Sequence, residues 1–213
     1  MPRHIPRFDQ ELSIQAQSAL AIVKAGELAH QSGGPLLRRE WSILRLEALY
    51  ELAYLRSFAA WEMYQEAVFL RSVCGYASAA GQETPVSGTY FPSLAAAEAA
   101  VLAGNTYMLW HSPQKVINRC KKFIGPGPQL QELTIASNFA RLDSFAATRH
   151  RIVHEQLDAK RKFDAATLLF AGRTYPSSRP GKFLRDWDIS QNPPQRWLGV
   201  AINELTSLLT QMI

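Results

Sequence analysis

The sequence has few cysteines and no long hydrophobic run, and both absences narrow the possible classes of protein. Its two cysteines, Cys74 and Cys120, are far apart and have no partners at metal-ligand spacing, which is typical of a reduced, cytosolic protein. No apolar run approaches the ~20 residues that a membrane helix needs. The first residues, 1–8, carry charge without the apolar core of a secretory signal. We therefore expect a cytoplasmic protein without a membrane segment.

Common catalytic signatures are missing as well. There is no Gly-rich phosphate loop of the Walker type, and no Ser-His-Asp set can be identified from spacing. His150 and His154 are four residues apart, but Arg151 stands where a zinc peptidase needs a glutamate, and neighbouring arginines would repel a cation. We expect no metal and no cofactor. The other histidines stand alone in the sequence, and no role is predicted for them: His4, His30 and His111.

What the sequence does contain is enough apolar material for a core. The 213 residues are 47% hydrophobic, so the chain can fold without disulfides or metals. No repeat, low-complexity tract or change in composition divides it, and we expect a single domain over residues 1–213. Apolar residues recur at steps of three and four, and no segment alternates as a strand would. The predicted fold class is all-α, an antiparallel helical bundle with long hairpin helices.

Capping residues, glycines and prolines set the expected ends of the helices. Ser93 is a candidate N-cap and Gly104 a stop for one short helix, and residues 125–128, Gly-Pro-Gly-Pro, are a firm interruption. The expected helices are Ser13–Gln31, Leu36–Cys74 (unbroken, or broken once near Phe58), Ser93–Ala103, Pro113–Phe123, Leu130–Ala171 and Pro194–Ile213, with loops over Gly75–Pro92 and Gly172–Pro194.

Positive charge is concentrated in one region. Of the net charge of +5, residues 141–185 carry +6, from ten Lys or Arg and four Asp or Glu, so the rest of the chain is close to neutral. A local excess of this kind attracts polyanions, of which nucleic acid is the commonest. The alternative is a solvated basic surface without a ligand.

Arg149, His150 and His154 are the residues best suited to catalysis, and we expect them near the middle of the helix over residues 130–171. Two histidines four residues apart share one helical face, and the long arginine side chain can bend toward the same groove. Histidine exchanges protons near neutral pH, and a guanidinium fits phosphate oxygens as they gain charge. The alternative is a surface arginine beside histidines with structural hydrogen bonds.

This combination suits RNA cleavage without a metal. The ribose 2′-hydroxyl would attack the adjacent phosphate and expel the 5′-oxygen, leaving a 2′,3′-cyclic phosphate and a 5′-hydroxyl. DNA, which lacks the 2′-hydroxyl, would be spared. One helix supplies a sparse site, so we expect a homodimer in which two copies of the helix face each other across a twofold axis, with the active site at the interface.

The spacing Arg149-x4-His154, with the polar His150 after the arginine, resembles the R-x4–6-H motif of the HEPN superfamily (higher eukaryotes and prokaryotes nucleotide-binding domains). The similarity covers roughly Leu36–Lys162 and is loose outside the motif. It implies a helical bundle in which Arg149 and His154 are the catalytic pair and His150 supports them. It also implies a metal-independent ribonuclease, usually dimeric, with a role in toxin–antitoxin systems, abortive infection or related defence, and an antitoxin or inhibitor protein as a possible partner.

A carboxylate in an aromatic segment is the candidate supporting residue. The stretch Phe58–Tyr64 looks like a helix of prokaryotic HEPN members that carries an acidic residue amid aromatics. Glu62 would then orient a histidine or the arginine across the bundle. The alternative is a solvated helix charge, which its same-face neighbour Glu66 favours.

The segment after residue 172 interleaves bases with aromatics, as RNA-binding segments do. Tyr175 could stack on a base while the cations hold phosphates; the alternative is an ordinary solvated loop. The predicted RNA-binding residues are Arg151, Arg173, Tyr175, Arg179, Lys182 and Arg185.

Two other functions remain open. A non-catalytic HEPN-like module could bind nucleotide, RNA or a partner protein, and it would need charge rather than proton transfer. A DNA-binding regulator is a further possibility, although the sequence has no compact helix-turn-helix unit.

Overall fold

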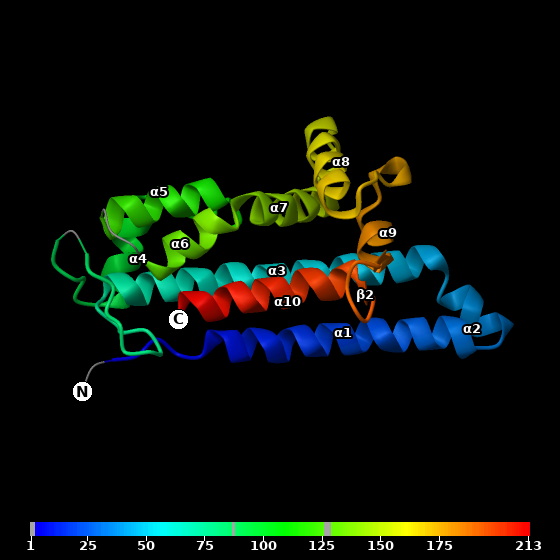
Figure 1. The fold of residues 1–213 in the computed structure, drawn as a ribbon, viewed down its shortest axis with the longest axis horizontal. Coiled ribbons are helices and arrows are strands. Elements are labelled where there is room, and N and C mark those ends of the chain that lie inside the picture. The colour runs from blue at the N-terminus through cyan, green and yellow to red at the C-terminus, as the bar shows by residue number, and fades with distance from the viewer. Residues whose placement is uncertain (1–2, 87, 126–128) are drawn as a thin grey trace. The chain divides into compact units, whose positions relative to one another are not determined.

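A computed structural model describes residues 3–86, 88–125 and 129–213, and within them the regular secondary structure is helical apart from one two-stranded sheet (Figure 1). The predicted all-α class is therefore confirmed. The chain divides into two compact units, each described here by itself. The first is built from residues within 1–11, 61–143 and 206–213, and the second from residues 12–60 and 144–205. The single domain over residues 1–213 stays a prediction.

Helices of different lengths follow one another along the chain, and the two short strands lie just before the last helix. No helix of the described residues is both long and apolar enough to cross a membrane. In order, the elements are α1 (Phe8–Ser32), α2 (Pro35–Glu40), α3 (Ile43–Val73), α4 (Leu94–Leu102), α5 (Pro113–Phe123), α6 (Leu130–Ser137), α7 (Phe139–Val153), α8 (Leu157–Ala171), the 3₁₀ turn η1 (Pro176–Ser178), α9 (Pro180–Arg185), β1 (Trp187–Asp188), β2 (Gln195–Arg196) and α10 (Trp197–Met212).

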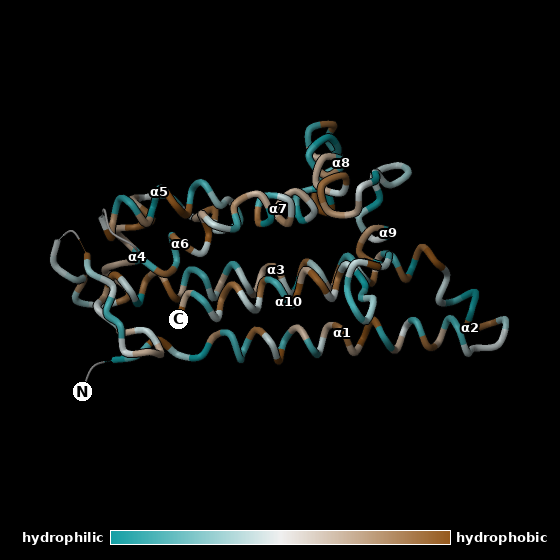
Figure 2. Tube along the Cα trace, in the orientation of Figure 1, coloured by the Kyte–Doolittle hydropathy of each residue, from teal (hydrophilic) through white to brown (hydrophobic). Residues whose placement is uncertain are grey.

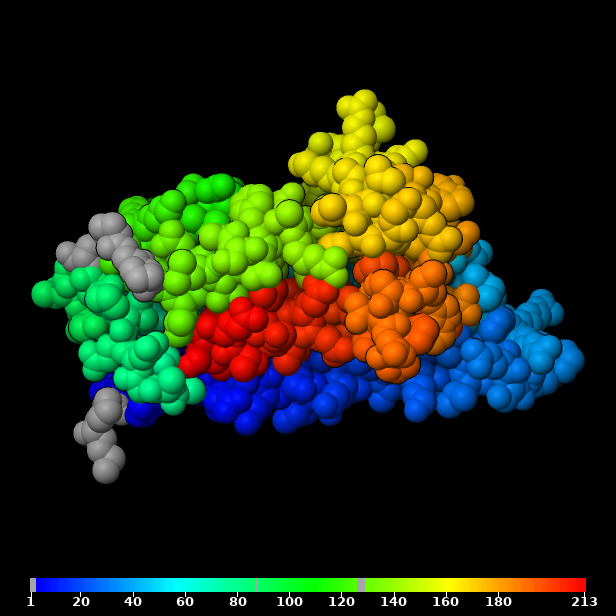
Figure 3. All heavy atoms as spheres, in the orientation of Figure 1, coloured from blue at the N-terminus to red at the C-terminus, as the bar shows by residue number. Residues whose placement is uncertain are grey.

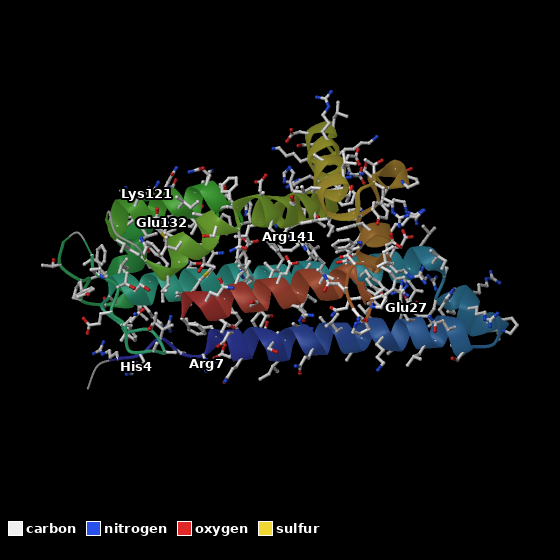
Figure 4. All side chains as sticks on the ribbon, in the orientation of Figure 1. His4, Arg7, Glu27, Lys121, Glu132 and Arg141 are labelled. Atoms are coloured by element: carbon white, nitrogen blue, oxygen red, sulfur yellow. The ribbon has the colours of Figure 1, made fainter. Side chains whose placement is uncertain are left out.

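The core of the first unit is aromatic. Phe8 stacks on Tyr64 with ring centroids 5.3 Å apart, and Phe69 contacts Trp110 at 5.4 Å. Cys120 on α5 is also buried, and burial raises the pKa of its thiol to about 12, so it stays protonated. At the surface, Lys121 of α5 and Glu132 of α6 point toward one another, with 3.8 Å between their charged atoms (Figure 4).

One predicted capping site in this unit is confirmed. The hydroxyl of Ser93 accepts a hydrogen bond from the backbone N–H of Ala96 at 3.1 Å, and α4 begins at the next residue. The helix ends at Ala103 and Gly104, which both have positive φ, as expected for a glycine stop. The predicted interruption over residues 125–128 lies mostly outside the described residues.

The second unit has its own aromatic core. Phe183 of α9 contacts the rings of four other residues, with centroids 5.5 to 6.3 Å apart. Tyr54 of α3 donates a hydrogen bond to the backbone carbonyl of Phe145 in α7 at 2.8 Å. Hydrophobic and hydrophilic residues alternate at short intervals along the helices of this unit, as one buried and one solvated face require (Figure 2). The rings around Phe183 belong to Phe163, Phe170, Tyr175 and Trp197.

The helix expected over residues 36–74 is broken, but at Trp41 and not near Phe58. The backbone carbonyl of Trp41 accepts a hydrogen bond from Nδ1 of His30 at 2.7 Å, so it is not available to continue the helix. α3 then restarts after Ser42, whose carbonyl accepts from Leu46. His30, for which the sequence predicted no role, fixes this corner.

The helix expected over residues 130–171 is wrong as a single element, because it divides into α6, α7 and α8. The second break follows directly on Val153. Nη1 of Arg151 donates to the carbonyl of His154 at 3.0 Å, and Gln156 adopts an extended conformation before α8 begins. Within the second unit, α8 stands steeply across the end of α7 (Figure 1).

The loop expected over residues 172–194 is also partly wrong, because it contains η1, α9 and β1. Pro180 starts α9. β1 pairs antiparallel with β2, with Trp187 opposite Arg196. Gly181 permits α9 to approach α3 closely, because a Cβ at that position would lie 2.4 Å from the carbonyl oxygen of Glu47. Its N–H donates to the Glu51 carboxylate at 2.8 Å.

Candidate functional site

The predicted catalytic residues lie at the carboxyl end of α7 and not in the middle of a long helix. The backbone N–H of His154 still donates to the carbonyl of His150 at 2.9 Å, which completes the last turn. The two imidazole rings are 4.5 Å apart between centroids and inclined at 51°. The adjacency predicted from their spacing is therefore confirmed. Arg149, His150 and His154 are all half-buried.

His150 is biased toward its neutral form. Burial lowers its pKa first, and the positive charge of His154 lowers it further. Lys162 and Arg149 act in the same direction, and Asp158 opposes them. A neutral imidazole near a guanidinium can accept a proton at neutral pH.

The sequence did not single out Asp158 and Lys162. They form an ion pair of 2.8 Å on α8, four residues apart, so the helical spacing could have identified the pair. Its position near His150 depends on the turn between α7 and α8, which no local signal predicted.

Arg151, which is predicted to contact RNA, forms two hydrogen bonds within the chain. Its Nε donates to the carbonyl of Ser178 at 3.2 Å, while its Nη1 holds the carbonyl of His154. Ser178 in turn donates to Asp164 at 2.7 Å. Arg151 thus ties the end of α7 to η1 and fixes the backbone beside the histidines.

All five of the other predicted RNA-binding residues line one cavity of about 500 Å³ in the second unit. It lies in the segment between α8 and α10, and Figure 3 shows this segment at the surface beside α8. Ile43 and Glu47, at the start of α3, complete its wall. The cations that line the cavity are Arg173, Arg179, Lys182, Arg185 and Arg196; the sequence analysis did not identify the last of these.

Carboxylates hold three of these arginines in place, and two of the carboxylates come from distant parts of the chain. Arg185 forms two hydrogen bonds to Glu27 of α1, of 2.7 and 3.1 Å, and Arg179 pairs with Glu47 of α3. Arg173 pairs with Asp186. Figure 4 labels Glu27, which is only 8% exposed. Burial is the largest single influence and raises its pKa, but the hydrogen bond and charge of Arg185, together with Tyr50 and Arg196, outweigh burial and leave the pKa lowered.

Tyr175 does not have the exposure that base stacking requires. It is 5% exposed, its ring contacts Phe183 edge-on at 5.5 Å, and its hydroxyl donates to Asp186 at 2.6 Å. The guanidinium of Arg173 lies 5.3 Å from the ring centroid. The ring forms a wall of the cavity, and its stacking on a base stays a prediction that this burial does not favour.

The buried tyrosines of this region give a prediction about alkaline stability. Burial, aided by nearby carboxylates, raises the pKa of Tyr50 and of Tyr175 to about 12, whereas unfolded phenols ionise near pH 10. Their contribution to stability is complete below pH 10 and is lost as the pH rises to 12. We expect the free energy of unfolding to fall in this window by roughly 2 kcal/mol for each tyrosine.

Urea unfolding at pH 9, 10 and 11 measures this effect. Lysines also titrate there, so Tyr50→Phe is the control: it should show a shallower decline with pH than the wild type. Parallel curves for the two proteins would contradict the assignment to Tyr50.

Glu62, the predicted supporting carboxylate, belongs to the first unit, whereas the histidines of α7 belong to the second. It is buried and accepts a hydrogen bond from the Tyr107 hydroxyl at 3.1 Å. Its carboxylate also lies 3.4 Å from Nδ1 of His111. The alternative of a solvated charge is wrong, and His111, for which no role was predicted, is a histidine that Glu62 contacts.

Among the residues that the structure describes, no group of three or more His, Cys, Asp or Glu side chains could hold a metal ion. Comparison with protein-family models, with curated proteins and with solved structures gave no match. The functional argument therefore depends on the residues themselves.

Proposed function

We propose that the chain is a metal-independent endoribonuclease whose catalytic residues are Arg149, His150 and His154. The observation that carries the proposal is the pair of imidazoles 4.5 Å apart at the end of α7, with the half-buried Arg149 directly before His150 in the chain. Two adjacent proton-exchanging groups beside a permanent cation are what transfer of a phosphoryl group between hydroxyls requires.

The chemistry follows from these groups. A neutral imidazole removes the proton of a ribose 2′-hydroxyl, and the resulting oxygen attacks the adjacent phosphorus. The 5′-oxygen leaves and takes a proton from a second, protonated imidazole. Arg149 stabilises the charge that gathers on the non-bridging oxygens. The products are a 2′,3′-cyclic phosphate and a 5′-hydroxyl, so protons and bonds balance without a metal or a cofactor.

The biological setting is proposed from the resemblance of the Arg149-x4-His154 spacing to HEPN ribonucleases. In this proposal the protein acts in the cytoplasm as a toxin or an abortive-infection effector and is restrained by an antitoxin or inhibitor protein. Exposed apolar residues border the histidines, namely Val153 at 49% and Leu157 at 61% exposure, and they support a homodimer that brings two copies of the site together.

A non-catalytic module that binds RNA or nucleotide is the second candidate, and the cation-lined cavity favours it. The two functions differ in their dependence on His154. Binding should survive His154→Ala, because it needs charge, whereas cleavage should not.

The direct test is incubation of the purified protein with single-stranded and hairpin RNA in the presence of EDTA. We expect fragments that end in 2′,3′-cyclic phosphate, identified by mass spectrometry, and no cleavage of a DNA oligonucleotide of the same sequence. RNA that stays intact across these substrates, or cleavage that EDTA abolishes, would refute the proposal.

A further inference from the structure

The cavity between α8 and α10 shares no residue with the imidazole pair, and its lining carries an excess of positive charge. Five cationic side chains and two carboxylates, Glu47 and Asp186, line it, so the lining carries a net charge of +3. Its volume of about 500 Å³ lies within the roughly 300–1,000 Å³ that is common for small-ligand pockets. A ligand for this cavity should be compact and carry several negative charges.

The arginines are oriented before any ligand arrives. Arg179 is held by Glu47, Arg173 by Asp186, and Arg185 by Glu27. Each pair uses only some of the five N–H donors of a guanidinium, so donors remain for a second acceptor. Guanidinium forks match the oxygens of phosphate groups, and fixing the forks in advance lowers the entropy lost on binding.

Lys182 differs from its neighbours in the cavity. It is exposed, and among the residues that the structure describes its side chain forms no ion pair or hydrogen bond. An ammonium group at the rim, without an internal carboxylate partner, can turn toward a bound anion at little structural cost. Lys182 is therefore the side chain that a ligand can recruit most readily.

The convergence of the cations on one cavity favours a terminal phosphate group over an internal phosphodiester as the ligand. Internal phosphates carry one charge each and are spread along an extended strand, whereas the cations here converge on one hollow. A terminal phosphate gains nearly a second charge, since its second pKa is about 6. Ile43 and Pro176 add apolar surface to the wall, which suits a ribose or a base.

We infer that this cavity binds the terminal polyphosphate group of a nucleotide, carried either by a free nucleoside triphosphate or by the 5′ end of an RNA. The inference stands on the cavity and does not require cleavage at α7. If the proposed ribonuclease activity also holds, the cavity would distinguish RNAs by the state of their 5′ ends.

The test measures binding with the His154→Ala protein, so that no RNA is cleaved. The probes are inorganic triphosphate, ATP, and one RNA oligonucleotide prepared with either a 5′-triphosphate or a 5′-hydroxyl. Calorimetry serves for the small probes and fluorescence anisotropy for the RNAs, at two salt concentrations. The proposed ribonuclease activity is measured separately on the wild type, so a failure to bind triphosphate can be distinguished from a failure to cleave RNA.

We expect triphosphate probes to bind more tightly than the 5′-hydroxyl RNA. Binding of ATP without a preference between RNA ends assigns the cavity to a free nucleotide, and preference for the 5′-triphosphate RNA without ATP binding assigns it to an RNA end. Lys182→Gln should weaken binding about tenfold, as expected for the loss of a charged hydrogen bond. Lys160→Gln, an exposed lysine of α8 outside the cavity, should change it little.

Two results would overturn the inference. One is equal affinity for the two RNA ends together with no binding of ATP or triphosphate. The other is an equal effect of Lys182→Gln and Lys160→Gln, which would indicate general attraction to a basic surface. Thermal melting of both variants checks that they remain folded.

Discussion

Replacing Arg149 or His154 by alanine is expected to abolish RNA cleavage while leaving the protein folded. Loss of a proton-transfer group costs about 10²–10⁴-fold in rate, and loss of a group that stabilises transition-state charge costs about 10²–10³-fold. The fold should tolerate His154→Ala, because its hydrogen bonds in this region, to His150 and from Arg151, involve backbone atoms. Rates on a labelled RNA and melting temperatures of the same preparations measure both parts.

Two control variants distinguish a specific effect on catalysis from a general effect of lost positive charge. Arg161→Ala removes an exposed arginine from α8, outside the imidazole pair, and should retain most of the activity. Arg149→Lys keeps the charge but loses the planar fork, so it should restore only part of the rate. Activity of the His154→Ala protein equal to that of the Arg161→Ala protein would remove His154 from the mechanism.

The His154→Ala variant should also produce a change that NMR can measure. The charge of His154 contributes to lowering the pKa of His150, although burial is the larger cause. His154→Ala should therefore move the pKa of His150 upward toward its ordinary value, and an NMR titration of the His150 ring measures this. An unchanged pKa would show that the two rings do not share an electrostatic environment in solution.

Local signals in the sequence predicted local structure. Ser93 was identified as a cap because a helix start depends on the few residues that follow it, and the contact between His150 and His154 follows from the helical period alone. No glycine or proline near Val153 indicates the break that follows it. It involves a side chain, Arg151, that bonds the carbonyl of His154 and also that of Ser178, 27 residues away.

The cavity could not be predicted from the sequence either, because it also depends on contacts between residues that are far apart in the chain. The basic segment could be recognised as a cluster of cations, but their carboxylate partners lie far away in the chain: Arg179 and Glu47 are 132 residues apart, and Arg185 and Glu27 are 158 apart. Only the packing of α9 against α1 and α3 brings these charges together. The burial of Tyr175 likewise involves a residue of α9, because its ring contacts Phe183.

Phe183→Ala is expected to give the largest loss of stability in the second unit. The ring is 3% exposed and lies among Phe163, Phe170, Tyr175 and Trp197, so its removal leaves a cavity that four aromatic neighbours cannot easily fill. Truncation of a buried phenylalanine costs about 3–5 kcal/mol, which corresponds to a melting temperature lower by roughly 6–20 °C for a chain of this size.

Circular dichroism melting and urea unfolding measure the loss, and Ile189→Ala is the matched control. Ile189 is 84% exposed, so its truncation should leave the melting temperature nearly unchanged. Because Phe183 lies between Lys182 and Leu184 on α9, the same substitution should also weaken triphosphate binding, whereas Lys182→Gln weakens binding without loss of stability. If Phe183→Ala melts within about 2 °C of the wild type, the aromatic cluster does not hold α9 in place, and the cavity that α9 helps to form would lose its structural basis.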